Sequence, residues 1–187
     1  MFDRVETSVP GVLVIKPKVF RDARGFFTES YHAAKFGEIG IHDAFVQDNH
    51  SQSCSATLRG LHYQLRHPQA KLCRVVRGEV LDIAVDIRRG SPTFRKWVGV
   101  TLSADNMHQI YIPAGFAHGF VVLSDVADFI YKCSDFYDPA DENGIHWADP
   151  DLAIDWGIAN PTLSAKDSCY PRLAEQPVDL LPIYQPS

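Results

Sequence analysis

Short stretches in which apolar and polar residues alternate recur along the chain up to about residue 135. A period of two is typical of β-strands that bury one face, and glycine, proline and acidic residues separate the stretches. In the first half of the chain, only residues 32–39 have a pattern that predicts a helix. Strands are predicted at about 12–15, 26–30, 44–51, 57–64, 71–76, 80–87, 96–102, 108–112, 119–123 and 128–133.

About ten short strands with almost no helix predict an all-β protein, an antiparallel sandwich or barrel of jelly-roll type. Gly78 and Glu79 are predicted to form a hairpin turn between the strands that begin at Lys71 and Val80. The sequence contains no internal repeat or linker, so one domain over residues 1–187 is expected.

The part of the chain from residue 138 onward is rich in proline, which predicts loops with at most short helices. Trp147, Leu152, Ile154 and Trp156 are apolar and are expected to hold this tail against the sheet. The last dozen residues are expected either to fray or to pack on a partner subunit.

The composition is that of a soluble globular protein, with 45% apolar and 22% charged residues among 187. A net charge of −5 suggests no general affinity for nucleic acid. The N-terminus has no apolar signal core and no run approaches the ~20 apolar residues of a membrane span, so a cytoplasmic protein is expected. The cysteines form no CxxC pair and no metal-ligand spacing, which favours free thiols in a reducing compartment. They are Cys54, Cys73, Cys133 and Cys169.

Candidate chemistry is concentrated in one predicted strand and in the lysine that opens the next strand, Lys71. Strict alternation puts His62 and Gln64 on one face of the first strand and Arg59 on the other face. Gly60, next to a cation, indicates that something approaches the backbone closely there. Each basic residue taken alone is explained as well by a structural role, so a functional hypothesis needs partners elsewhere in the chain.

Residues 112–118 contain a Pro-x-Gly-x-x-His pattern, ending at His118, that resembles the second motif of cupins. The resemblance implies a double-stranded β-helix jelly roll. Metal-binding cupins also supply a His-x-His pair and a glutamate from a first motif. Here residues 62–64 read His-Tyr-Gln and Lys71 stands in place of the glutamate, so we expect a site without a metal or cofactor.

A histidine base beside a lysine cation suits the abstraction of a proton next to a carbonyl group, because a fixed ammonium stabilises the enolate oxygen. Inverting a carbon also needs a proton donor on the opposite face of the substrate. Tyr131, which shares a predicted face with Phe129 and Cys133, is a candidate for that donor. A core aromatic role explains Tyr131 at least as well.

Six segments together resemble the dTDP-4-dehydrorhamnose 3,5-epimerase family in their order and spacing, over residues 12–171. The segments are 24–27, 45–51, 58–64, 113–120, 131–132 and 163–167. The family acts on a thymidine-diphospho-4-keto-6-deoxyhexose, in which C3 and C5 flank the keto group. Both protons are therefore acidified by the enolate chemistry described above.

The resemblance implies that His62 is the catalytic base and that Asp167 orients it. Lys71 would stabilise the enolate oxygen, and Tyr131 would be the acid on the other face. Tyr137 would stack on the thymine, and the family is typically homodimeric. The residues that the resemblance places around the nucleotide sugar are Arg24, Glu29, Gln47, Asp48, Asn49, Arg59, Lys71, His118, Glu142 and Lys166.

The main hypothesis is a cofactor-free epimerase that inverts both C3 and C5 in the route to dTDP-L-rhamnose. One alternative inverts a single centre or serves another deoxysugar. A catalytically silent sugar-nucleotide-binding cupin would keep Arg24, Arg59 and Tyr137, but it has no reason to keep a histidine–aspartate pair with a lysine and a tyrosine. A metal-dependent cupin oxygenase is the third alternative, and metal analysis of the purified protein would separate it.

Overall fold

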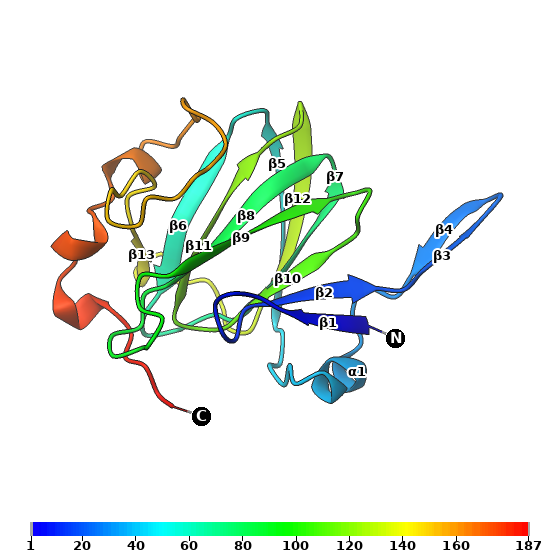
Figure 1. Cartoon of the computed structure of the whole chain (residues 1–187), viewed down its shortest axis with the longest axis horizontal. Coiled ribbons are helices and arrows are strands. Elements are labelled where there is room, and N and C mark those ends of the chain that lie inside the picture. The colour runs from blue at the N-terminus through cyan, green and yellow to red at the C-terminus, as the bar shows by residue number, and fades with distance from the viewer. Residues whose placement is uncertain (1, 187) are drawn as a thin grey trace.

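Two antiparallel β-sheets packed face to face form the body of the protein in the computed structural model, which describes residues 2–186 (Figure 1). One sheet contains β1 (Phe2–Glu6), β2 (Leu13–Pro17), β5 (Gln47–Cys54), β7 (Lys71–Arg77), β10 (Gln109–Ile112) and β12 (Val126–Cys133). The other contains β6 (Leu58–Gln64), β8 (Glu79–Asp86), β9 (Trp97–Ser103), β11 (Phe116–Val122) and β13 (Glu142–Gly144). The strand orders are β1-β2-β10-β7-β12-β5 and β13-β6-β11-β8-β9.

The remaining elements are short. Strands β3 (Val19–Asp22) and β4 (Gly25–Thr28) pair only with each other, and α1 (Ala33–Glu38) follows them. Three 3₁₀ turns lie in the tail: η1 (Asp167–Cys169), η2 (Leu173–Glu175) and η3 (Val178–Leu180). Among the described residues, none of the helices has the length and apolarity needed to span a membrane.

The prediction of an all-β jelly roll is confirmed, and every predicted strand overlaps an observed one. The helix predicted at 32–39 corresponds to α1. The pattern of apolar residues does not predict β3, and it does not predict β1 or β13 either. After Phe2, the residues of β1 are all exposed, and β13 has only three residues, so neither strand has a clear alternation.

The predicted hairpin at Gly78 is wrong. Strand β7 pairs with β10 and β12, whereas β8 pairs with β9 and β11, so the chain passes at Gly78 from one sheet to the other. Gly78 has a φ of +76°, and a Cβ there would lie 2.0 Å from the carbonyl oxygen of Val126. Glycine is therefore required by a crowded corner between the sheets rather than by a hairpin.

Two of the three hydrophobic cores lie on either side of the five-stranded sheet. The core between the two sheets includes Phe120 and Phe129, whose rings stack with their centroids 4.2 Å apart. The second core lies between the outer face of the five-stranded sheet and the tail, and it includes Leu152 and Trp156. Trp147 and Ile154 pack against it, as predicted from the sequence.

The end of the tail is attached to the body rather than frayed. Arg89 forms an isolated parallel bridge with Ile183, and the Tyr184 amide donates a hydrogen bond to the Arg89 carbonyl at 2.9 Å. The side chain of Leu181 is buried. Fraying of the last dozen residues is thus wrong as far as Tyr184, while Ser187 lies outside the described residues, as does Met1 at the other end.

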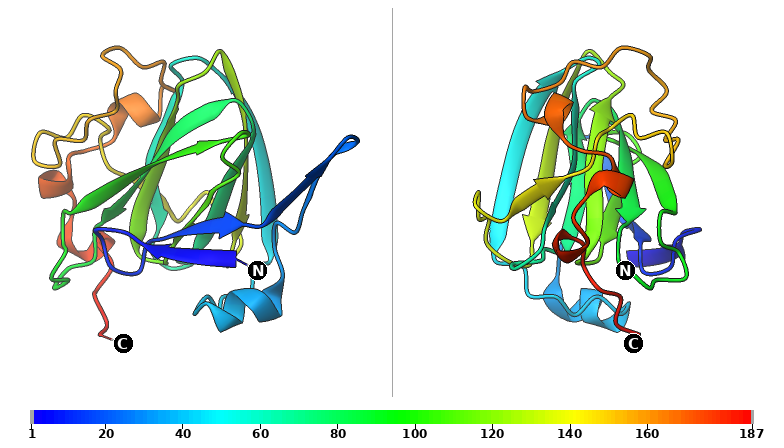
Figure 2. Two further views of the ribbon diagram at one scale, coloured as in Figure 1. Left: turned by 45° about the vertical axis from the view of Figure 1, so that its right-hand side comes forward. Right: turned by 90° about the vertical axis from the view of Figure 1, so that its left-hand side faces the viewer.

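The β3–β4 hairpin projects away from the body, on the side opposite the tail (Figures 1 and 2). We call it the arm. Its aromatic side chains are exposed: 54% for Phe20, 58% for Phe26 and 70% for Phe27. An exposed apolar surface of this size usually marks a place where a partner binds.

Candidate active site

A β-bulge in β6 decides which side chains face the space between the sheets. His118 of β11 pairs with His62, but Phe120 pairs with Arg59, so two residues of β6 lie opposite one residue of β11. Because of this extra residue, Arg59 and His62 line the same cavity. The expectation that they face opposite sides is therefore wrong.

Gly60 makes this bulge sterically feasible. Its φ is +126°, and a Cβ would lie 2.5 Å from the Cα of Gly119 and 2.8 Å from the carbonyl oxygen of His118. The close backbone approach inferred from the sequence is thus an approach between two strands. On the other side of β6, Leu58 and Leu61 are fully buried in the outer core.

The cavity has a volume of about 530 Å³ and opens beside the core between the sheets. Volumes of this order are typical of small-molecule sites. Its walls come from both sheets and from the tail. The lining residues are Gln47, Asn49, Ser51, Arg59, His62, Gln69, Lys71, His118, Phe120, Phe129, Tyr131, Tyr137, Glu142, Ser164, Lys166 and Asp167.

His62 and Asp167 form a close pair in the cavity. Nε2 of the imidazole lies 2.6 Å from Oδ1 of Asp167, which is buried at the start of η1. Burial alone would raise the pKa of Asp167, but the hydrogen bond and charge of His62 outweigh it and the pKa is lowered. An ionised Asp167 only accepts hydrogen bonds, so His62 donates Nε2–H and its Nδ1 carries the lone pair of a base.

Lys71 and Tyr131 come from the facing sheet. Adjacent strands β7 and β12 pair Lys71 with Cys133 and Cys73 with Tyr131, and the side chains of Lys71 and Tyr131 line the cavity. Burial is the largest effect on Tyr131 and raises the pKa of its phenol. The phenol therefore stays protonated near neutral pH and can donate a proton.

His118, in the segment that resembles the second cupin motif, has a buried partner. Its Nε2 lies 3.0 Å from both carboxylate oxygens of Asp82, and Sγ of Cys73 is 4.0 Å away. In the described part of the chain, these are the one group of three potential metal ligands that meets within 4.8 Å. Burial lowers the pKa of His118 and raises that of Cys73.

This donor set fits a hydrogen-bonded pair better than a metal. A neutral imidazole donates Nε2–H to Asp82, a protonated thiol is a weak ligand, and the ammonium of Lys71 lines the same cavity. Gln64, where metal-binding cupins carry the second histidine, is also committed elsewhere. Its amide group donates to the carbonyl oxygens of His67 and Phe136 and accepts from the Asp138 amide.

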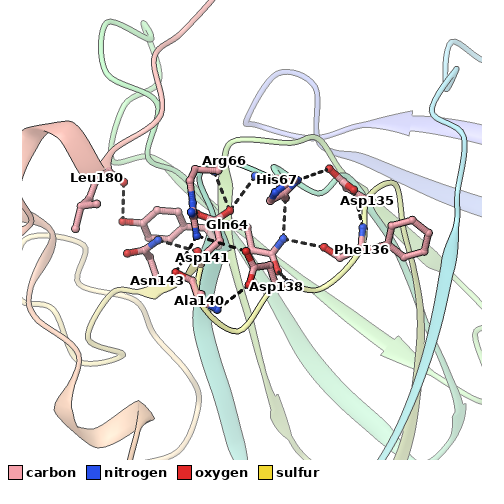
Figure 3. Close-up of polar contacts among 11 residues, drawn as sticks. Gln64, Arg66, His67, Asp135, Phe136, Asp138, Ala140, Asp141, Asn143 and Leu180 are labelled. Carbon is pink, nitrogen blue, oxygen red and sulfur yellow. Dashed lines mark hydrogen bonds and ion pairs between the residues drawn. The ribbon is translucent and has the colours of Figure 1, made fainter.

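These contacts hold a loop in place (Figure 3). The loop carries Tyr137 and Glu142, which line the cavity. The carboxylate of Asp141 accepts the backbone N–H groups of Arg66 and His67, each at 2.8 Å. Oε2 of Glu142 accepts hydrogen bonds from the Tyr137 hydroxyl at 2.7 Å and from Nζ of Lys166 at 2.6 Å. The bond to Glu142 is the main reason that the pKa of Tyr137 is raised to about 12.

Most of the residues singled out from the sequence line this cavity, but three do not. Arg24 lies at the tip of the arm, 90% exposed, and its guanidinium contacts Asp22. Glu29 pairs with Lys35, and Asp48 faces the outer side of its sheet, where it pairs with Lys132. Among residues 2–186, no contact brings these three side chains to the cavity.

Sequence reasoning did not identify five lining residues as site residues. They are Ser51, Gln69, Phe120, Phe129 and Ser164. The two phenylalanines follow the ordinary alternation of core strands, so nothing in the sequence distinguishes them. Ser51 ends the unusually polar stretch 47–51, which was the available signal.

Known proteins resemble this chain along most of its length. The chain matches the family model described as dTDP-4-dehydrorhamnose 3,5-epimerase over residues 6–175. It is 57% identical over 162 residues to the dTDP-4-dehydrorhamnose 3,5-epimerase of Pseudomonas aeruginosa, a match that covers 86% of this chain and 90% of the relative. The dTDP-4-dehydrorhamnose 3-epimerase of Streptomyces niveus is 42% identical over 179 residues, which cover 94% and 86% of the two chains.

Among solved structures, a similar one is the crystal structure of the dTDP-6-deoxy-D-glucose-3,5-epimerase of Legionella pneumophila in complex with dTDP-4-keto-L-rhamnose. The two chains are 51% identical, each is covered completely, and the TM-score is 0.97. This likeness extends over the sheets, the arm and the tail.

Proposed function

The chain belongs to the dTDP-4-dehydrorhamnose 3,5-epimerase family, and from this premise we propose that it inverts C3 and C5 of dTDP-4-dehydro-6-deoxy-D-glucose without a metal or a cofactor. One observation carries the proposal. His62 with Asp167 lines one side of a cavity whose other side carries Tyr131 and Lys71. A base and an acid on facing sheets can reach opposite faces of one sugar ring.

Proton transfer starts at Nδ1 of His62. The C–H bond next to the ketone breaks, its proton moves to the imidazole, and its electron pair forms an enolate whose charge lies on the C4 oxygen. The ammonium of Lys71 stabilises that oxygen, which is the task a metal performs in other enolising enzymes.

Tyr131 completes each inversion. Its phenolic proton goes to the carbon from the opposite face, and the C4 carbonyl forms again. The phenolate then regains a proton from solvent while His62 loses its own. The same steps at the second carbon invert it in turn.

The polar groups around the catalytic four suit a nucleotide diphosphate. Arg59 and Lys166 supply positive charge for the two phosphates. Arg59 uses Nε to donate to Ser53 at 3.0 Å, which leaves the rest of its guanidinium for a ligand. We propose Gln47, Asn49, His118 and Glu142 as further contacts, and Tyr137, half exposed at the rim, as the platform for thymine.

A dimer would give roles to three residues that do not line the cavity: Arg24, Glu29 and Asp48. The exposed aromatic arm is suited to lie on a second copy of the chain, where Arg24 would reach the partner's nucleotide. Glu29 follows the arm, and Asp48 lies on the outer face of the six-stranded sheet, beside which the arm projects. We therefore propose a homodimer in which these residues act at or near the interface.

A single-centre epimerase is the second candidate, and a specific observation favours it: a relative with 42% identity is named as a 3-epimerase. The experiment that separates the two is incubation with dTDP-4-dehydro-6-deoxy-D-glucose in heavy water. NMR should show deuterium at both C3 and C5 together with the doubly inverted product. Exchange at one carbon would support the second candidate, and no exchange at all would contradict catalysis.

A further inference from the structure

The imidazole of His62 lies between the carboxylates of Asp167 and Glu142. Asp167 receives Nε2–H at 2.6 Å. On the other side of the ring, Nδ1 lies 3.8 Å from Oε1 of Glu142. That distance exceeds a hydrogen bond, so the lone pair of Nδ1 stays available to the cavity while a carboxylate faces it.

Glu142 has one oxygen held in place and one directed at the base. Oε2 accepts hydrogen bonds from Tyr137 and Lys166. Oε1 has no hydrogen-bond partner among the described residues, and its ion-pair contact is with His62. Burial alone would raise the pKa of Glu142, but the bonds from Lys166 and Tyr137 outweigh it and the pKa is lowered. Glu142 is therefore ionised near neutral pH.

The backbone around Glu142 is fixed to the strand that carries His62. In the ladder between β13 and β6, Glu142 pairs with Gln64 and Gly144 pairs with His62. The side chains of Gln64 and Asp141 hold the preceding loop through the hydrogen bonds drawn in Figure 3. The 12% exposed side chain of Glu142 thus stays beside the imidazole.

From this arrangement we propose that Glu142 is a positioning residue for the base, which stabilises the imidazolium formed when His62 takes the substrate proton. The inference rests on the proposed function, since it assigns a second carboxylate to the same base. The proton moves from carbon to Nδ1, the electron pair moves to the enolate oxygen, and Glu142 remains ionised throughout. Without Glu142, the same proton transfer would produce a less stable imidazolium at His62.

Tyr137 connects this carboxylate to the far end of the substrate. The ring proposed to stack on the nucleobase also donates its hydroxyl proton to Glu142. A substrate that orders Tyr137 therefore also orders the carboxylate beside His62. Binding of the nucleotide and strength of the base are linked through one hydrogen bond.

Several other titratable groups also face His62 and contribute to its electrostatic surroundings. The ring of Tyr170 packs edge-on with its centroid 5.7 Å from that of His62, and burial raises its pKa, so it is uncharged. His118 faces it from β11, Lys71 from β7, and Lys166 with Asp167 from the segment around η1. Of these, only Lys166 touches Glu142.

The discriminating measurement is the pH dependence of kcat/KM with dTDP-4-dehydro-6-deoxy-D-glucose. In Glu142→Gln, the imidazolium of the free enzyme loses a neighbouring negative charge, so the acidic limb should move to lower pH by about 0.5–1 unit. kcat should fall by about tenfold because a weaker base abstracts the proton more slowly. Lys166→Met should move the limb the opposite way, to higher pH, because Glu142 loses the cation that partly neutralises it.

Two further variants separate positioning from binding and from general effects of substitution. Tyr137→Phe keeps the ring for stacking but removes the bond to Glu142, so kcat should fall several-fold with KM unchanged. Glu38→Gln makes the same chemical change as Glu142→Gln on the exposed surface of α1 and should leave the profile as in the wild type.

The experiments distinguish failure of the inference about Glu142 from failure of the proposed function. If Glu142→Gln raises KM and leaves the acidic limb in place, Glu142 only binds substrate and the inference is wrong. If Glu142→Gln does not fold, the direction of the Lys166→Met shift decides, and a shift to lower pH overturns the inference. If the wild-type protein exchanges neither C3 nor C5 in heavy water, the proposed function itself fails, independently of Glu142.

Discussion

The proposed role of each residue in the cavity depends on its hydrogen-bond partners. Asp167 takes Nε2 of His62 and leaves Nδ1 free, and Asp82 takes Nε2 of His118. Burial keeps the phenol of Tyr131 protonated. The same side chains with other partners would have other protonation states, so the chemistry lies in the pairs rather than in the residue types.

Replacement of the first pair should separate catalysis from binding. His62→Ala removes the base and Asp167→Asn removes the acceptor of Nε2–H, so both should lower kcat by about 10²–10⁴. Affinity for dTDP, measured by calorimetry, should stay within about twofold. An Asp167→Asn protein with full activity would show that Asp167 does not orient the base.

Tyr131→Phe should impair proton return more than proton loss. In heavy water, the substrate should then take up deuterium at C3 while little inverted product forms. The ratio of exchange to inversion, followed by NMR, should rise at least tenfold over the wild type. Equal losses of exchange and inversion would argue against Tyr131 as the acid.

The residues that a sequence pattern can identify are those with unusual chemistry for their position. Gln47 and Asn49, polar residues within a strand, and the lysine at the start of β7 are examples, and all three line the cavity. Phe120 and Phe129 line it as well, but an apolar residue in a strand has the same pattern whether it faces core or substrate. Arg59 was assigned to the wrong face because alternation fails at a bulge that the sequence marks only by Gly60.

Among the elements, strand β6 depends on a single residue, Gly60. A Cβ at position 60 would meet the backbone of β11, which cannot move without disturbing His118. The bulge places Arg59 beside His62, so the site and the fold share this requirement.

Gly60→Ala should therefore destabilise the protein by several kcal/mol, about 3 or more, because it combines a backbone clash with a positive φ. Gly90→Ala is the matched control. Gly90 has a φ of +82° but no atom within 4 Å of its Cβ position, so the loss should be about 1–2 kcal/mol. Chemical denaturation of both variants measures the difference, and equal losses would contradict the clash.

The contacts of the arm within one chain do not explain its stability. Its strands pair only with each other, and a lone two-stranded hairpin is marginally stable in water. Phe26→Ser with Phe27→Ser should shift the protein from dimer to monomer in sedimentation experiments. Val178→Ser, which alters a side chain 61% exposed on the tail, should not. A wild-type monomer, or a doubly substituted dimer, would contradict the proposed role of the arm.

On the scale of the whole molecule, the jelly-roll class could be predicted because it depends on ten alternating stretches together. An error in one strand boundary does not change it. The pairing of strands could not be predicted. The Gly78 corner resembles a hairpin locally, and only the contacts of β7 and β8 with separate neighbours distinguish the two. The cavity likewise depends on how the two sheets and the tail meet, which no local pattern reports.

Stability of the whole fold should depend on pH through buried carboxylates. Asp86 is fully buried and accepts hydrogen bonds from Arg88, Ser91 and Thr93. Burial alone would raise the pKa of Asp86, but these donors outweigh it, and the pKa lies below its ordinary value of 3.8. A lowered pKa in the folded state stabilises the protein above about pH 3.8, and that contribution is lost as the pH falls through the folded-state value.

Asp86→Asn should accordingly lower Tm most at pH 6–7, by the equivalent of about 3 kcal/mol, and less at pH 3. Thermal melts of wild type and variant across this range measure the difference. A gap in Tm that is the same at pH 7 and pH 3 would show that the charge of Asp86 does not contribute.

Because the proposed base and the proposed acid belong to facing sheets, the distance between the sheets should limit which substrates the site accepts. Facing sheets lie about 10 Å apart where side chains fill the space between them, so a sugar ring fits only within the cavity of about 530 Å³. A bulky axial group on the sugar ring would push the two sheets apart and move the proposed acid away from the carbon that it protonates. Sugars with bulkier groups should then be accepted most readily after Phe120 or Phe129, whose rings stack between the sheets with centroids 4.2 Å apart, is replaced by a smaller residue. The reacting groups would stay unchanged.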